Sequence, residues 1–177
     1  YFKMVPMIAT LGTMYIFRGF SFLFSGGEWW FPHQFTEGYM AFATKKILGI
    51  PSILWILIIV FILAILFLGY TSKGRRIYAI GTNQESAQVA GIKQPRVVFL
   101  AMTLCGMLAG LSGMLYTANY ATCSYMIGDA YEMTAIAICI LGGVSIVGGK
   151  GKVDGVIIGF LMMSVITYFI SLLPGLS

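Results

Sequence analysis

The segment from Pro51 to Thr71 contains no charged residue and is almost entirely apolar. About twenty consecutive apolar residues are enough for an α-helix to cross the hydrocarbon core of a bilayer. Because lipid offers no hydrogen-bond partners to the backbone, a spanning segment has to be a helix or part of a closed barrel. The segment therefore predicts a transmembrane helix, and the remaining chain has to fold in and around a membrane.

The overall composition indicates that the chain crosses the membrane several times. Hydrophobic residues make up 59% of the sequence and charged residues 10%, whereas soluble proteins carry about 25% charged residues. A soluble domain of this composition would have too little polar surface to cover its core. Further apolar segments lie at about 4–24, 97–120, 131–149 and 153–173. We therefore predict an all-α, polytopic membrane protein that forms a single transmembrane unit over residues 1–177.

Positive charge is concentrated in the loop at 72–97, which carries five Lys and Arg side chains against two in the loop at 25–50. Cytoplasmic loops of membrane proteins are enriched in Lys and Arg. We therefore expect residues 72–97 to lie in the cytoplasm and residues 25–50 on the opposite side. The net charge of +5 is spread over short loops, so it indicates membrane topology and not nucleic-acid binding.

The charged loop is also predicted to contain one short helix, at about 83–90. Thr82 and Glu85 have the spacing of a capping box, in which each side chain accepts a hydrogen bond from the other residue's backbone N–H. Gly91 stands where a helix end favours a left-handed residue. A helix of two turns is not stable alone, so it is expected to dock on another surface. The alternative is an ordinary solvated connection between two spans.

The apolar segment at 131–149 is interrupted by glycine pairs. Irregular backbone at membrane depth is tolerated only where it is buried in protein or lines water. The segment is therefore predicted to be a broken or re-entrant helix and a candidate for the transport pathway, with close packing at a crowded interface as the alternative. If it crosses fully, Lys150 and Lys152 lie in the cytoplasm, and if it re-enters they lie outside. The candidate residues are Glu132, Gly142, Gly143, Gly148 and Gly149.

Two further features of the spans have open interpretations. Gly106, Gly110 and Gly113 form a small-residue stripe of the kind that lets two helices approach closely in lipid, so we predict helix packing there. Arg18 is a charge within the first apolar segment, and such a charge has to face protein, water or the membrane interface. It is either a packing or interfacial residue or part of the pathway.

The sequence predicts no catalytic, cofactor or metal site. Its six carboxylates are scattered over several loops, and His33 is the only histidine, so neither an acid–base pair nor a ligand cluster is apparent. The chain also lacks the glycine-rich loop followed by Lys and Ser or Thr that binds nucleotide phosphates. Any ATP-driven process is therefore expected to need a partner that hydrolyses ATP.

Three runs of residues resemble one family in the order in which they occur. They are residues 9–14 with Arg18 and Gly19, residues 74–92, and residues 131–137 with 141–145 and 148–151. Together they resemble the permease subunits of ATP-binding-cassette importers for simple sugars, of the ribose, galactose, xylose, rhamnose and autoinducer-2 type. Because such permeases are longer, the chain resembles their C-terminal half, and we expect a fragment or one piece of a split subunit.

The resemblance implies a larger machine in the bacterial inner membrane. Its other parts would be cytoplasmic ATPase subunits, a second permease subunit that is identical or related, and a periplasmic sugar-binding protein. The coupling helix that receives the ATPase motion would be formed by Thr82, Asn83, Gln84, Glu85, Ser86, Ala87, Gln88, Ala90 and Gly91. The rival functions are a secondary transporter or channel for a small neutral solute and a purely structural membrane subunit. The sequence does not identify the sugar.

Overall fold

The computed structural model describes residues 6–172, which divide into two compact units. The first unit holds the described residues up to Ile53 together with residues 112–129, and the second holds residues 54–111 and those from Ala130 onward. The predicted segments at 4–24 and 153–173 extend slightly outside the described residues. Each unit is described by itself below.

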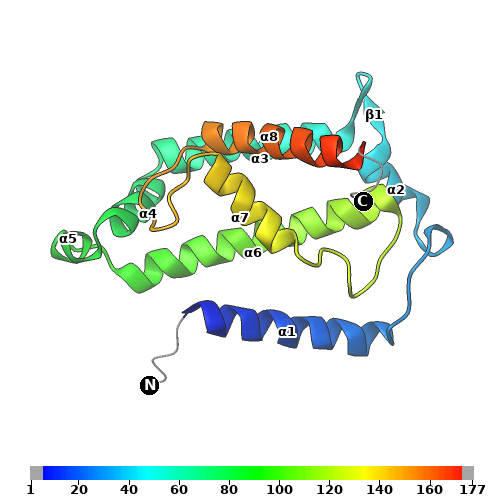
Figure 1. The fold of residues 1–177 in the computed structure, drawn as a ribbon, viewed down its shortest axis with the longest axis horizontal. Helices are drawn as coiled ribbons and strands as arrows, with labels where there is room; N and C mark the ends of the chain where they lie inside the picture. The colour runs from blue at the N-terminus through cyan, green and yellow to red at the C-terminus, as the bar shows by residue number, and fades with distance from the viewer. Residues whose placement is uncertain (1–5, 173–177) are drawn as a thin grey trace. The chain divides into compact units, whose positions relative to one another are not determined.

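The first unit combines a long helix with a short helix and a hairpin (Figure 1). Its elements are α1 (Pro6–Ser25), the 3-10 helix η1 (Pro32–Gln34), α2 (Glu37–Thr44), β1 (Lys46–Ile47), β2 (Ile50–Pro51) and the last part of α6 (Gln94–Tyr120). Small side chains allow close packing here, since Ala43 and Ala118 are almost completely buried. The Tyr39 hydroxyl donates to the Met114 carbonyl oxygen at 2.9 Å, which ties α2 to α6.

The hairpin is the one β element among the described residues, and each of its strands is two residues long. Leu48 and Gly49 both have positive φ, at 55° and 82°, as a type I′ turn requires. Lys46 pairs with Pro51 and Ile47 with Ile50. The predicted all-α class is confirmed, because the hairpin only connects α2 to the next span.

The second unit contains most of the remaining helices. They are α3 (Ser52–Tyr70), α4 (Ser72–Thr82), α5 (Gln84–Val89), the first part of α6, α7 (Tyr131–Leu141) and α8 (Val153–Ser171). In the part of the chain that is described, α1, α3, α6 and α8 are long and apolar enough to cross a membrane. Helix α7 has 11 residues, or about 16 Å, which is about half of the 30 Å hydrocarbon core.

Residues 72–97 contain two helices, which corrects the prediction of one. Thr71 caps α4 by accepting a hydrogen bond from the Gly74 backbone N–H at 3.0 Å. The first turn of α4 lies directly against the end of α3, since a Cβ on Gly74 would lie 2.5 Å from the Phe67 carbonyl oxygen. Sequence reasoning overlooked α4 because a polar stretch directly after a span was interpreted as a loop.

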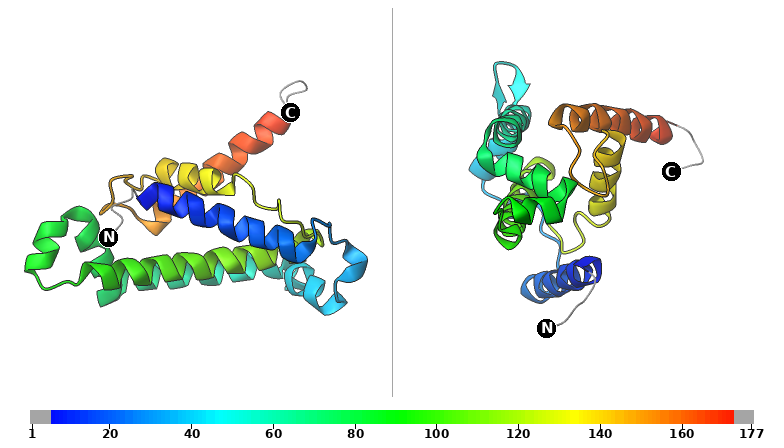
Figure 2. Two further views of the ribbon diagram at one scale, coloured as in Figure 1. Left: turned by 90° about the horizontal axis from the view of Figure 1, so that it is seen from below. Right: turned by 90° about the vertical axis from the view of Figure 1, so that its left-hand side faces the viewer.

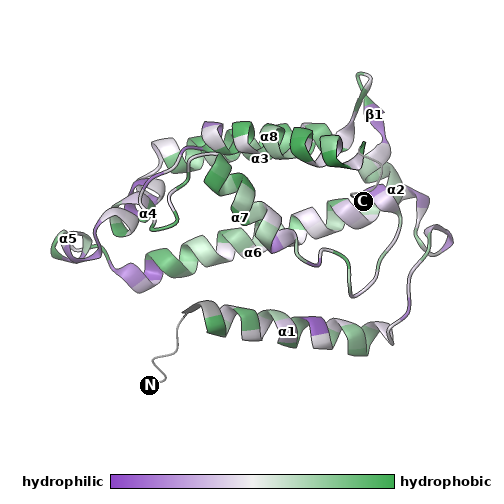
Figure 3. Cartoon of the chain, in the orientation of Figure 1, coloured by the Kyte–Doolittle hydropathy of each residue, from purple (hydrophilic) through white to green (hydrophobic). Residues whose placement is uncertain are grey.

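The long helices α3 and α8 are mostly apolar, whereas α1 and α6 also carry polar turns (Figure 3). Large apolar side chains such as Phe17, Leu63 and Phe169 are mostly exposed to the surroundings of the chain. Exposed apolar area on this scale marks contact with lipid or with other helices. Figure 2 shows α4 and α5 beyond the N-terminal end of α6, apart from these apolar surfaces.

Candidate functional site

Helix α5 is capped by Asn83. The Asn83 side chain accepts a hydrogen bond from the Ser86 backbone N–H at 3.0 Å, and its own backbone is extended, at φ −155° and ψ 110°. An extended residue with a short polar side chain is the usual N-cap. The predicted capping box of Thr82 and Glu85 is therefore wrong by one residue.

Thr82 has a different role, as the last residue of α4. Its hydroxyl lies 2.9 Å from the Tyr78 carbonyl oxygen and 3.3 Å from the Gly149 carbonyl oxygen. The side chain that accepts a hydrogen bond at the start of α5 is that of Asn83, whereas the Thr82 hydroxyl is directed at these two carbonyl oxygens. Thr82 thus connects α4 to a segment far along the chain.

The C-terminus of α5 is closed by a Schellman motif. Gly91 has a φ of 77°, which confirms the left-handed conformation predicted for it. The Gly91 N–H donates to the Gln88 carbonyl oxygen at 2.9 Å, and the Ile92 N–H donates to that of Ala87 at 3.0 Å, as the motif requires. The helix therefore has defined ends on both sides.

The side chains of α5 divide between a buried and an exposed face. Ala87 is buried, at 5% exposure, whereas Val89 is 91% exposed. Gln84, Glu85, Ser86, Gln88 and Ala90 are also exposed. Gln84 Nε2 donates to Gln94 Oε1 at 2.5 Å, which ties the start of α5 to the start of α6. The result is a short, anchored helix with an open surface.

Residues 142–152, here called the glycine loop, join α7 to α8. Helix α7 ends at Leu141, and Gly143, Gly148 and Gly149 have φ values of 79°, 99° and 74°. The predicted break at Gly142 and Gly143 is confirmed, since α7 ends there. No helix resumes among the described residues before Val153, so the second pair lies within the loop and does not break a helix. A backbone hydrogen bond from Ser145 to the Lys150 carbonyl oxygen, at 2.9 Å, closes the loop on itself.

The glycine loop packs directly on α4. A Cβ on Gly81 would overlap the backbone nitrogen of Gly149 and lie 2.8 Å from its Cα. The Tyr78 hydroxyl donates to the Gly151 carbonyl oxygen at 3.0 Å. Lys150 and Lys152 belong to this loop and therefore lie on the side of α4, which the charge pattern predicts to be cytoplasmic.

Helices α7 and α8 form a V whose closed end is the glycine loop (Figure 1). Three glycines bring the two backbones together there: a Cβ on Gly142 would lie 2.5 Å from the Gly155 carbonyl oxygen, and one on Gly159 would lie 2.7 Å from the Gly142 nitrogen. Glu132 stands in the first turn of α7, away from the closed end. A negative side chain is favourable at a helix N-terminus.

A groove of about 410 Å³ lies between α7 and α8, with hydroxyl and aromatic side chains on its walls. They include Thr134, Phe160, Ser164, Thr167 and Tyr168. Uncharged hydroxyls next to aromatic rings are typical of sites for neutral polar solutes. Sequence reasoning did not find these residues, because Ser and Thr scattered through an apolar span carry no local signal.

The glycine stripe on α6 has no neighbour within the described chain. A Cβ on Gly106, Gly110 or Gly113 would meet nothing within 4 Å. Helix packing by this stripe stays a prediction.

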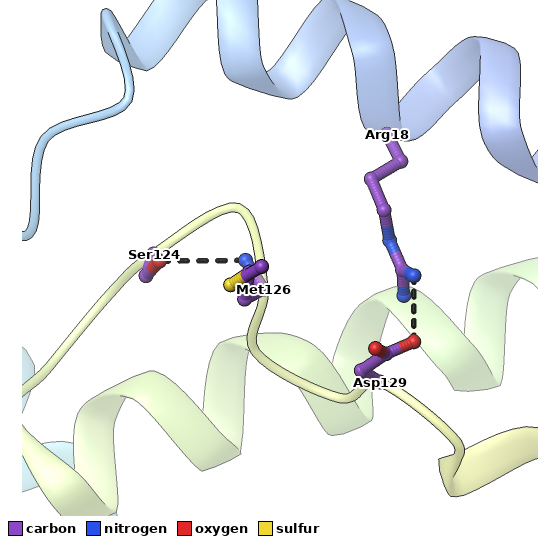
Figure 4. A network of polar contacts seen from close by, with 4 residues as sticks. All are labelled: Arg18, Ser124, Met126 and Asp129. Carbon is purple, nitrogen blue, oxygen red and sulfur yellow. Dashed lines mark hydrogen bonds and ion pairs between the residues drawn. The ribbon is translucent and has the colours of Figure 1, made fainter.

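The first unit contains an ion pair between distant parts of the chain. Arg18 Nη1 of α1 lies 2.6 Å from Asp129 Oδ1 (Figure 4). Nearby, the rings of Phe22 and Tyr125 meet edge to face at 5.1 Å. Sequence reasoning weighed Arg18 alone and missed its partner.

Comparison with known proteins decides the family. Residues 1–175 match the family described as "Branched-chain amino acid transport system / permease component". The chain belongs to this permease family. Its residues 6–172 therefore describe part of a multi-pass membrane protein, as the four apolar helices of that part already indicate.

The permease has curated relatives with printed transport functions. It is 36% identical over 171 residues to the ribose import permease protein RbsC of Bacillus subtilis, covering 97% of this chain and 53% of the relative. It is 36% identical to RbsC of Escherichia coli K12 and 34% identical to the autoinducer 2 import system permease protein LsrC of Salmonella choleraesuis. The permease chain thus spans about half the length of these relatives. No solved structure matches it.

Proposed function

We propose that this chain is part of the permease subunit of an ATP-binding-cassette importer in the bacterial inner membrane. The relatives named for ribose and autoinducer-2 import support a sugar or a related small polar solute as cargo. The partners would be cytoplasmic ATPase subunits, a second permease subunit and a periplasmic solute-binding protein. The chain would contribute no catalytic chemistry, because ATP hydrolysis would take place in the ATPase subunits.

The observation that carries the proposal is α5 as a short helix with both ends fixed. A coupling element has to be rigid in order to transmit a force, and it has to offer a surface to a partner. Asn83 and the Schellman motif provide the rigid ends, and Val89, which is 91% exposed, provides apolar contact area. An apolar side chain that protrudes from an otherwise polar helix favours a protein partner.

The contacts of α4 supply a route from α5 to the spans. Motion of α5 would pull on α4, since a single residue separates the two helices. Thr82, Tyr78 and Gly81 of α4 contact the glycine loop, which continues into α7 and α8. The groove between α7 and α8 would then widen or narrow as the ATPase subunits close and open. Packed elements of this kind transmit displacement because interiors resist compression.

The experiment is co-purification from native membranes. The complete transporter that contains this chain is tagged on the permease and solubilised gently, and bound ATPase subunits are identified. We expect the ATPase to be retained by the native protein and lost when residues 83–90 are replaced by a Gly/Ser linker. The same linker in place of residues 46–50 of the hairpin serves as the control and should retain the ATPase.

A secondary transporter is the second candidate. The ion pair of Arg18 and Asp129 favours it, because ion-coupled carriers place paired ionisable residues within their spans. The two functions differ in their energy source. Uptake that persists without ATP and stops with a protonophore, together with no co-purified ATPase, would overturn the importer assignment.

A further inference from the structure

Arg18 lies inside a candidate membrane span. It is the only charged residue of Ile8–Ser25, and it precedes the helix end at Ser25 by seven residues, or about 10 Å. A charge at such a depth is costly unless it faces protein, water or an opposite charge. Its position therefore calls for a polar environment within the membrane.

The segment that carries Asp129 runs alongside α1, from the C-terminal end of this helix toward its middle. Cys123 pairs through its backbone with Trp30 in the loop beyond α1, at 2.9 and 3.2 Å. Tyr125 then contacts Phe22, and Asp129 reaches Arg18. Along this segment the contacts thus shift from Trp30, in the loop after α1, to Phe22 and then to Arg18 within α1. Residues 125–129 therefore run alongside the last turns of α1 as irregular backbone, and such backbone within the hydrocarbon core is stable only against protein or water.

The carboxylate of Asp129 remains largely open. The side chains of Arg18 and Asp129 are 24% and 63% exposed, and the pair is joined through Oδ1. No other side chain among residues 6–172 donates to this carboxylate. A carboxylate offers about four lone-pair sites, so it can accept further hydrogen bonds. An open carboxylate cannot face lipid, and it therefore points to a water-filled space or to a polar partner.

We infer that Arg18 and Asp129 form a solute-contact site at which Asp129 accepts hydrogen bonds from a neutral polyhydroxylated solute. This inference rests on the proposed importer function and deepens it. A polyol fits because adjacent hydroxyls can donate to the carboxylate without separating the ion pair. A zwitterionic amino acid would have to break the 2.6 Å contact to pair with both charges.

The test is uptake of labelled ribose by the complete transporter in proteoliposomes, with the same binding protein throughout. Asp129→Asn removes the charge, and the double exchange Arg18→Asp with Asp129→Arg keeps an ion pair in reversed order. Glu37→Gln, at an exposed carboxylate in the first turn of α2, is the matched control. Each protein is also assayed with 2-deoxyribose, 3-deoxyribose and 5-deoxyribose, and its ATPase stimulation is measured.

We expect the preference for ribose over at least one deoxyribose to fall about fivefold in Asp129→Asn, the size of one lost hydrogen bond. The double exchange should insert into the membrane and stimulate the ATPase as the native protein does. Its preference for ribose over the deoxyriboses should remain low. Unchanged preferences in Asp129→Asn, or full recovery in the double exchange, would show a purely structural ion pair and overturn the inference.

The proposed function has its own readout in the same assay. Native protein that retains no ATPase subunit on purification, and shows no ATPase stimulation with any simple sugar tested, would overturn the importer assignment and the inference with it. Native uptake with unchanged preferences in the variants would overturn the inference alone.

Discussion

Gly81 of α4 and Gly149 of the glycine loop meet through their backbones. Neither position has room for a side chain: a Cβ on Gly81 would lie 2.8 Å from the Gly149 Cα, and a Cβ on Gly149 would lie 2.6 Å from the Gly81 carbonyl carbon. The two residues therefore form the tightest link between the proposed coupling region and the V of α7 and α8. A substitution at this contact therefore tests the proposed route from α5 through α4 to α7 and α8.

Gly81→Ala is predicted to weaken this link. The new methyl group has only backbone atoms to displace, so we expect a cost of about 1–3 kcal/mol and a loss of solute moved per ATP hydrolysed. Uptake and ATPase activity in proteoliposomes measure that ratio. Gly38→Ala on α2 meets open space within the described chain and serves as the control. A normal ratio in Gly81→Ala would contradict the route.

Gly159→Ala is predicted to destabilise the closed end of the V. Its methyl group would lie 2.7 Å from the Gly142 nitrogen and would also overlap the Ile138 carbonyl oxygen, which forces α7 and α8 apart. We expect a loss of about 1–3 kcal/mol, seen as a lower Tm of the detergent-solubilised protein. The matched control is Gly38→Ala on α2, which has no such neighbour within the described residues. Equal Tm values for the two variants would rule out the packing described here.

Asn83→Ala and Glu85→Ala are predicted to differ in their effects. Asn83→Ala removes the N-cap of α5, which costs about 1 kcal/mol, and should weaken retention of the ATPase during purification. Glu85→Ala should have a smaller effect, because the cap does not use Glu85. The retained ATPase is quantified at increasing salt for each variant and for Asn83→Asp, which keeps a capping side chain. A stronger effect at Glu85 than at Asn83 would support the capping box instead.

Ala87→Pro is predicted to separate ATP hydrolysis from uptake. Proline at this position loses the bond from the Ala87 N–H to the Asn83 carbonyl oxygen, 3.1 Å long, and breaks α5. Gln84→Pro is the control, because proline is tolerated at the first helical position and Asn83 before it is already extended. We expect membrane insertion of both variants and coupled uptake only in Gln84→Pro. Coupled uptake in Ala87→Pro would remove α5 from the mechanism.

The sequence alone was sufficient for features that depend on nearby residues. The apolar run that forms α3 predicts a span, because burial in lipid depends on the composition of the run itself. The left-handed conformation of Gly91 was predicted correctly, because glycine adopts positive φ at little cost. The end of a helix at the pair Gly142 and Gly143 was predicted as well. The role of α5 in coupling remains a prediction.

Tertiary contacts decided the features that local rules leave ambiguous. Thr82 and Asn83 are both good capping residues, and the choice between them follows from the end of α4, where Thr82 reaches Gly149. The length of α7 was overestimated, because the apolar residues after Leu141 belong to the glycine loop and not to a helix.

The ion pair of Arg18 and Asp129 is the clearest example of a feature that local sequence rules do not predict. The two residues are 111 positions apart, and neither lies in a local pattern that refers to the other. Sequence by itself determined which segments are apolar enough to enter a membrane, because the transfer of apolar side chains into lipid is a local free energy. Only the tertiary structure decided which polar groups meet there, because such pairing depends on how the backbone brings distant segments together.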